Sequence, residues 1–159
     1  MSNLHIRQAT PADLNAVAAL FDAYRQFYEQ PANPALALQF IGERMQNRES
    51  VILLAETGGA DASVVGFCQL YPSFCSVIAK PIYTLYDLYV SPSARKTGAG
   101  RALMLAAFQH AETGGFARLD LTTARSNHTA QALYESLGWQ RDEVFLAYNK
   151  VVDAVQPKA

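Results

Sequence analysis

The chain has 159 residues, of which half are apolar and 17% are charged, and this composition is typical of one soluble globular domain. Its formal net charge of −1 excludes the basic field that draws nucleic acids or anionic membranes, so we expect neither as a partner. No apolar run approaches the ~20 residues of a membrane span, and the first residues lack a signal-peptide pattern, so we expect a cytoplasmic protein. Cys68 and Cys75 lack metal-ligand spacing and are expected to be reduced thiols.

The first half of the chain is predicted to form a strand, two helices and three further strands. Residues 4–10 alternate as a strand does, and the segment Thr10-Pro11-Ala12-Asp13 favours the start of a helix that ends near Phe27. Residues 35–46 resume a helical pattern after two prolines. Strands are predicted at 50–57, 63–73 and 81–90, and the first two of these form a hairpin.

The second half alternates helices with strands. Helices are predicted at 98–113, closed by Gly114-Gly115, and at 126–138, and strands at 116–123 and 142–150. The resulting order, β-α-α-β-β-β-α-β-α-β, indicates an α/β fold with a mixed sheet and helices on its faces. We expect one domain over residues 1–150 and a C-terminal tail over residues 151–159.

Small residues at the start of the predicted helix 98–113 indicate an anion site. The N–H groups of a helix start lack partners and carry the positive end of the helix dipole, so they bind phosphate. Gly98, Ala99 and Gly100 would let a pyrophosphate approach that backbone. Nearby positive charge comes from Arg95, Lys96 and Arg101. A plain glycine turn is the alternative.

Two nucleotide motifs are excluded by the residues around these glycines. A Walker loop needs Lys and Ser/Thr after its second glycine, where this chain has Arg101-Ala102. A dinucleotide fingerprint needs a third glycine, where this chain has Leu103, and almost no residues between its strand and its glycines, where this chain has seven.

The pattern that does fit is Arg-x-x-Gly-x-Gly after a strand, in LYVSPSARKTGAGRALM. This motif resembles the coenzyme A site of the GCN5-related N-acetyltransferase (GNAT) family. Downstream, ARSNHTAQALYESLGW resembles the second signature of that family, with Asn127, then Tyr134, then Leu137-Gly138-Trp139. HIRQATPADLNAV resembles its first strand and helix, so the resemblance covers most of the chain. LYDLYV and FLAYNK further resemble the polyamine and small-amine branch.

The resemblance implies the GNAT fold, a mixed and mostly antiparallel sheet with splayed central strands and about four flanking helices. It implies transfer of an acetyl group from acetyl-CoA to a primary amine without a metal. The residues that it assigns to the coenzyme are Leu88, Tyr89 and Val90 at the thioester oxygen, and Arg95, Lys96, Thr97, Gly98, Ala99, Gly100, Arg101 and Asn127. One strand amide at that oxygen is typically worth about 10²–10³ in rate.

Tyr134 stands at the position of the family's general acid. A phenol with a pKa of about 10 is a suitable acid for a thiolate whose thiol has a pKa near 8.5. The alternative is an aromatic residue that only packs on its helix.

Asp87 is a second catalytic candidate, because a carboxylate is unusual inside a strand. It would bind the substrate ammonium or pass its proton to water; pairing with an arginine is the alternative. Many members of the polyamine branch carry Glu-Asp here, whereas this chain has Tyr86-Asp87, which argues against a strongly dicationic substrate.

Aromatic residues are expected to form the substrate side, where a ring can hold an amine by cation–π contact. These residues are Tyr24, Tyr28 and Tyr86, together with Phe27 and Tyr83. Filling the core or an interface is the alternative. We expect a small-molecule amine as acceptor and, from the ring-rich strands near the C-terminus, a homodimer. A protein or peptide acceptor, and a non-catalytic acyl-CoA-binding module, are the rival functions.

Overall fold

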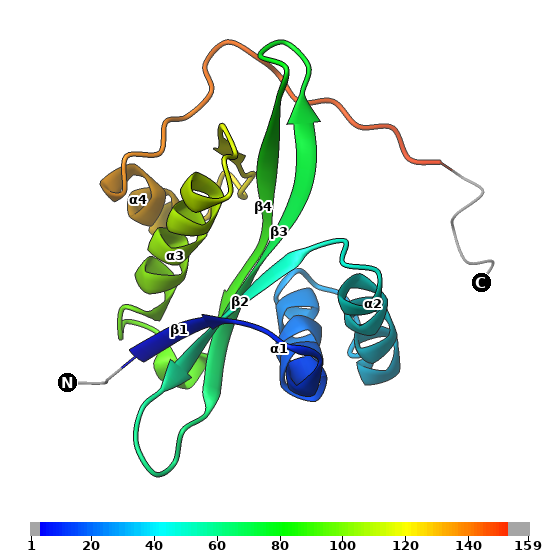
Figure 1. Cartoon of the computed structure of the whole chain (residues 1–159), viewed down its shortest axis with the longest axis vertical. Helices are drawn as coiled ribbons and strands as arrows, with labels where there is room; N and C mark the ends of the chain where they lie inside the picture. The colour runs from blue at the N-terminus through cyan, green and yellow to red at the C-terminus, as the bar shows by residue number, and fades with distance from the viewer. Residues whose placement is uncertain (1–3, 153–159) are drawn as a thin grey trace. The chain divides into compact units, whose positions relative to one another are not determined.

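The computed structural model describes residues 4–152. The chain divides into two compact units, residues 1–124 and 125–159, and each is described by itself. The first unit contains β1 (Leu4–Gln8), η1 (Pro11–Asp13), α1 (Leu14–Phe27), α2 (Pro34–Gln46), β2 (Val51–Thr57), β3 (Val64–Cys75), β4 (Lys80–Val90), η2 (Pro92–Ala94), α3 (Ala99–Thr113) and β5 (Leu119–Asp120). The second contains α4 (His128–Ser136) (Figure 1).

The five strands form one sheet in the order β1-β2-β3-β4-β5. The first four pair antiparallel, and β4 pairs parallel with β5. The sheet is therefore mixed and mostly antiparallel, as predicted. The pairing of β4 with β5 consists of Tyr83 with Leu119 and Thr84 with Asp120. Within residues 4–152, no strand pairs with β4 on that side beyond Thr84, and this opening is the predicted splay.

A β-bulge interrupts the pairing of β4 with β3. Gln69 lies opposite Asp87 and the next residue, Leu70, lies opposite Leu85. Tyr86 is therefore an extra residue in β4, which bends the strand at this point. Its ring is exposed.

Helices cover both faces of the sheet in the first unit, with α1 and α2 on one face and α3 on the other (Figure 1). The core between the sheet, α1 and α2 consists of Val17, Ala18, Leu20, Phe21, Ala37, Ile41, Ile52, Leu54 and Phe67. The buried side of α3 consists of Ala99, Leu103, Met104, Ala107 and Ala111. The spacing of three and four residues among the helical members of both sets is the pattern of helices that bury one face.

The predicted strand at 142–150 is wrong. The carboxylate of Asp142 accepts hydrogen bonds from the N–H groups of Val144 and Phe145, at 2.8 and 2.9 Å. This local turn competes with an extended backbone, and the side chains that follow are exposed instead of packed. The predicted strand at 116–123 is shorter than expected, because only Leu119–Asp120 continues the ladder with β4.

Both cysteines are free thiols, as expected, and Cys68 is fully buried. Burial raises the pKa of the Cys68 thiol to about 12. Over residues 4–152, no helix combines the length and apolar character that crossing a membrane requires.

Candidate active site

Asp87 is buried inside the sheet with 2% of its surface exposed. Its carboxylate accepts a hydrogen bond from the side-chain amide of Gln69, which lies opposite it on β3. Burial raises the pKa of Asp87 to about 6, and the hydrogen bond from Gln69 lowers it in part. Within the described residues Asp87 forms no ion pair, so the alternative of an arginine partner is not supported.

The open edge of β4 begins two residues before Asp87. The N–H of Ser91 donates to the carbonyl of Val65 on β3, at 2.8 Å. Because N–H groups alternate sides along a strand, those of Leu88 and Val90 point away from β3, toward the open edge. The unpaired edge therefore presents two backbone donors on either side of Tyr89, close to a buried carboxylate.

The glycine loop places a helix N-terminus after this strand. Gly98 precedes the first residue of α3 and has a φ of +92°, which glycine adopts without strain. A side chain at Gly98 would meet no protein atom within 4 Å. Lys96 also lies in the left-handed region, at φ +64°, and the hydroxyl of Thr97 donates to the carbonyl of Ala94, at 2.6 Å. The loop thus turns sharply and leaves open space at the start of α3.

Arg95 connects this loop to the end of β4. Its Nε donates to the carbonyl of Val90, at 3.1 Å. Its guanidinium carbon lies 6.0 Å from the ring centre of Phe27 and 5.8 Å from that of Tyr89. The guanidinium is thereby held against α1 and β4, where it contributes a positive charge beside the loop.

The predicted aromatic side of the site lies on α1 and on the bulge. The hydroxyl of Tyr24 donates to the carbonyl of Tyr86, at 3.2 Å, and the ring of Tyr24 contacts that of Tyr28 edge-on. Phe27, Tyr28 and Tyr86 are 56%, 46% and 66% exposed. These rings therefore do not fill the core.

Tyr83 does not belong to this aromatic cluster. Its ring stacks on that of Phe116, with centres 3.7 Å apart, and lies near His110 of α3. Tyr83 is 5% exposed. It is a core residue on the α3 face of the sheet, so for Tyr83 the alternative of filling the core holds.

Asn127 and Tyr134 belong to the unit 125–159. The side-chain oxygen of Asn127 accepts from the N–H of Ala130, at 3.2 Å, and so caps α4. Tyr134 lies in the last turn of α4, and its ring centre is 6.1 Å from that of Trp139. The N–H of Trp139 donates to the carbonyl of Tyr134, at 3.1 Å. The second motif therefore folds as a capped helix with an aromatic pair, and the catalytic role of Tyr134 stays a prediction.

Two residues beside Asp87 escaped the sequence analysis. Gln69 is fully buried, and its side-chain oxygen accepts from the hydroxyl of Ser50, at 2.7 Å. Gln69 is the one strongly polar side chain in the apolar run VVGFCQL. A polar residue in a buried strand needs a partner, so this interruption of the pattern was the available signal.

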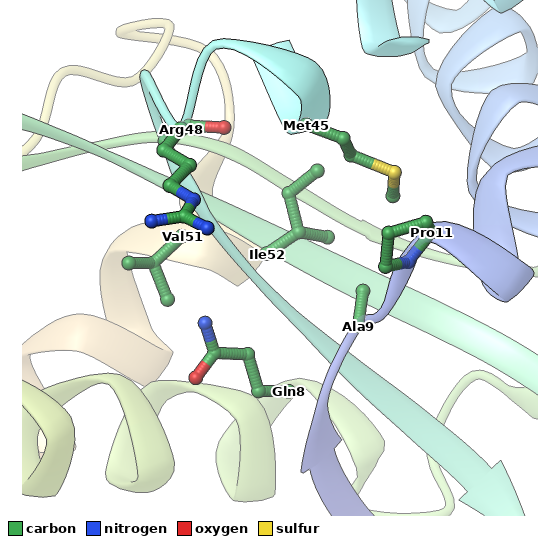
Figure 2. Close-up of a pocket in the computed structure, with 8 residues that line it drawn as sticks. Gln8, Ala9, Pro11, Met45, Arg48, Val51 and Ile52 are labelled. Carbon is green, nitrogen blue, oxygen red and sulfur yellow. The ribbon is translucent and has the colours of Figure 1, made fainter.

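A pocket of about 310 Å³ lies between the end of β1 and the start of β2. It is lined by Gln8, Ala9, Pro11, Met45, Arg48, Ser50, Val51 and Ile52. Figure 2 shows the side chains of Gln8, Arg48 and Val51 pointing toward one another across it. None of the predicted site residues lines this pocket, but Ser50 does. The described residues contain no cluster of three or more potential metal-binding side chains.

The sequence matches the acetyltransferase (GNAT) family over residues 17–139. The chain belongs to the GNAT acetyltransferase family. The predicted family, fold and N-acetyltransferase activity are confirmed, and so is acetyl-CoA as the acetyl donor that GNAT enzymes use. Which branch of the GNAT family the chain falls in stays a prediction.

Individual GNAT proteins match nearly the whole chain. YhfO, an uncharacterised N-acetyltransferase of Bacillus subtilis, is 45% identical over 145 residues, which are 91% of this chain and 95% of YhfO. The D-amino-acid N-acetyltransferase HPA3 of Saccharomyces cerevisiae is 26% identical over 148 residues, which are 91% of this chain and 89% of HPA3. The crystal structure of a probable acetyltransferase is 36% identical, with a TM-score of 0.87 over 94% of this chain and 98% of that one.

Proposed function

We propose that this GNAT enzyme transfers an acetyl group from acetyl-CoA directly to the primary amine of a small molecule. The observation that carries the proposal is a buried carboxyl, Asp87, within the open edge of β4 and next to the amide donors of Leu88 and Val90 that point toward that edge. Acetyl transfer needs a base for the amine and a donor for the developing oxyanion, and this stretch of β4 provides both kinds of group.

The donor side uses the open edge and the loop. The thioester oxygen of acetyl-CoA accepts from the N–H of Leu88 or Val90, which stabilises the negative charge that develops there. The pyrophosphate lies on the amides of residues 96–101, in the open space at Gly98. Arg95, Lys96 and Arg101 supply positive charge around it.

The acceptor side uses Asp87. With a pKa of about 6, its carboxyl is mostly ionised at pH 7 and binds the substrate ammonium. The amine passes one proton to Asp87 or through it to solvent, and its lone pair attacks the thioester carbon. The carbon–sulfur bond then breaks, and Tyr134 protonates the departing thiolate of coenzyme A. The nitrogen of the new amide gives up its second proton to the Tyr134 phenolate or to solvent.

A small acceptor is favoured over a protein acceptor by the aromatic residues around the site. The exposed rings of Tyr28 and Tyr86 suit a ligand with an apolar body and a single amine. HPA3, which is similar over most of both chains, is named as acting on D-amino acids. Free amino acids are therefore the first acceptors to examine.

The test is release of free thiol from acetyl-CoA in the presence of separate classes of amine: amino acids, monoamines, polyamines and peptides with free N-termini. We expect single small amines to give the largest kcat/KM and Asp87→Asn to abolish most of that activity. Peptides that react faster than every small amine would overturn the small-molecule assignment. Coenzyme binding in calorimetry without thiol release from any amine would favour the non-catalytic module.

A further inference from the structure

A chain of hydrogen bonds runs from the start of β2 across β3 to the Asp87 carboxylate on β4. The hydroxyl of Ser50, directly before β2, donates to the side-chain oxygen of Gln69 on β3, at 2.7 Å. The amide nitrogen of Gln69 donates in turn to Asp87 on β4. Gln69 has no exposed surface, whereas Ser50 lines the pocket of Figure 2.

The direction of this chain is fixed by the chemistry of its two ends. An ionised carboxylate only accepts hydrogen bonds, so Gln69 must turn its nitrogen toward Asp87. Its oxygen then faces Ser50, whose hydroxyl can serve as donor or acceptor and here donates. A bond from an amide to a charged oxygen is about twice as strong as one between neutral groups, so this arrangement favours the ionised form of Asp87.

We propose that Gln69, oriented by Ser50, is a positioning residue that holds the Asp87 carboxylate ionised and in one orientation for the amine. This inference rests on the proposed role of Asp87 in acetyl transfer. An arginine beside Asp87 could also stabilise the ionised carboxylate, but its positive charge would repel an ammonium substrate. The neutral amide of Gln69, which is fully buried, stabilises the carboxylate without that repulsion.

The other titratable groups around Asp87 do not change charge near neutral pH. Those whose ionisation is coupled to its charge are Tyr24 from α1 and Cys68 and Tyr71 from β3. Burial raises the pKa of all three further above neutral. Arg44 of α2 acts on Tyr71 and forms its ion pairs with Glu43 and Glu49. Between pH 5 and 8 the carboxyl itself is therefore the group of this set that changes charge.

The first test replaces Gln69 by Met, which has a similar volume and no hydrogen-bonding amide. We expect the acid limb of kcat/KM against pH to move upward by roughly 1 to 2 pH units, because the ionised form loses a charge-assisted hydrogen bond. The activity ratio of Gln69→Met to wild type should rise toward one between pH 6 and pH 9. A ratio that is low and constant with pH would mean a packing role only and would overturn the proposal.

Variants of Ser50 test the same hydrogen-bond chain without changing a fully buried residue. Ser50→Ala should shift the acid limb in the same direction by a smaller amount, and Ser50→Thr, which keeps the hydroxyl, should restore it. Gln39→Met is the matched control, since Gln39 is an exposed α2 residue bonded to Glu43 and its loss should leave the profile unchanged. Should Gln69→Met fail to fold, an unshifted profile for Ser50→Ala overturns the proposal.

A spectroscopic readout separates this inference from the proposed function. The carboxyl carbon of Asp87, assigned by comparison with Asp87→Asn, is titrated by NMR in the full chain with and without Gln69→Met. We expect its pKa to be higher in the variant, and equal values would overturn the role of Gln69. Full activity of Asp87→Asn would instead reject Asp87 as a catalytic group while the titration still decides what Gln69 does.

Discussion

Asp87 occupies surroundings that oppose its own charge, and this has a consequence for folding. Its pKa in the folded chain is about 6, above the ordinary value of 3.8, because burial disfavours the carboxylate. The folded state therefore binds this proton more tightly than the unfolded state does. Stability from this group is fully present below about pH 4 and is lost as pH rises through 6.

Asp87→Asn should accordingly stabilise the fold at neutral pH while it removes activity. We expect the variant to exceed wild type by up to about 3 kcal/mol in free energy of unfolding at pH 8, and to match it near pH 3.5. Urea unfolding at the two pH values measures this difference. A variant that is equally or less stable at pH 8 would contradict the cost assigned to the buried charge.

Kinetics can separate the proposed acid role of Tyr134 from a packing role. Replacing it by Phe keeps the ring beside Trp139 and removes only the hydroxyl. We expect turnover to fall by about 100-fold, as is typical for loss of a general acid, with the Kd of acetyl-CoA unchanged. Tyr148→Phe, at an exposed tyrosine of the same unit, is the control. Wild-type turnover in the Tyr134→Phe variant would remove it as the acid.

At the scale of elements, the turn into α3 requires glycine at position 98 for two reasons: the backbone has a positive φ there, and the absence of a side chain leaves space open in front of the helix. Gly98→Ala should cost about 1 kcal/mol of stability, because φ is +92° there, and should weaken acetyl-CoA binding at least tenfold. Gly59 offers a matched control, with φ +105° and no atom within 4 Å of an added carbon. Calorimetry and thermal unfolding should show equal strain in both alanine variants and a coenzyme defect in Gly98→Ala alone.

A cluster of charged side chains connects β1 to η1 and β2. Arg7 donates to both carboxylate oxygens of Asp13, at 2.8 Å, and to Glu56 on β2, at 2.6 Å. These bonds hold the pKa values of Asp13 and Glu56 below their ordinary range. The stabilisation is therefore present above about pH 5 and is lost as the carboxylates are protonated at lower pH.

Arg7→Met tests this dependence. We expect a loss of about 1 kcal/mol at pH 7, the size typical of a partly exposed ion-pair cluster, and a smaller loss at pH 2, where part of the carboxylate charge is neutralised. Thermal unfolding at both pH values provides the comparison. A loss at pH 2 as large as that at pH 7 would indicate that the aliphatic part of Arg7, rather than its charge, matters.

Elements with strong local determinants could be predicted from the sequence, and those set by competing contacts could not. The proline and acidic residue after Thr10, and the glycines on either side of α3, mark ends that the structure reproduces. The strand expected at 142–150 failed because one carboxylate, Asp142, bonds two following amides. The bulge at Tyr86 was invisible, since apolar and aromatic residues occupy both faces of 81–90.

At the scale of the whole molecule, the family could be predicted because its motifs fall in both compact units. The glycine loop lies in residues 1–124, and Asn127 and Tyr134 lie in residues 125–159. The identity of the acceptor could not be predicted, because its recognition depends on exposed rings whose arrangement comes from tertiary packing. Tyr83 and Tyr86 illustrate this point: three residues apart in one strand, one is a core ring and the other is exposed.

Self-association is also a prediction for the whole chain. Large apolar side chains of the second unit are at least 65% exposed, namely Val144, Phe145, Leu146, Tyr148, Val151 and Val152. A stretch of this kind marks an interaction surface. We expect sedimentation of the full chain to give twice its mass of 17.4 kDa, and Phe145→Ser to shift it toward the monomer. A wild-type monomer at every concentration would reject the homodimer.

The bulge in β4 keeps the later side chains of the strand on the faces that their pairing with β3 requires. In a regular strand Tyr83 and Asp87, four residues apart, would point the same way. With Tyr86 inserted, the ring of Tyr83 packs against Phe116 beside α3, while Asp87 meets Gln69 on the α1 face. Deleting Tyr86 would leave Asp87 three residues after Tyr83, so the two side chains would still point to opposite faces and Asp87 would stay opposite Gln69. The bulge therefore adds an exposed ring next to the carboxylate without changing the face that the carboxylate occupies.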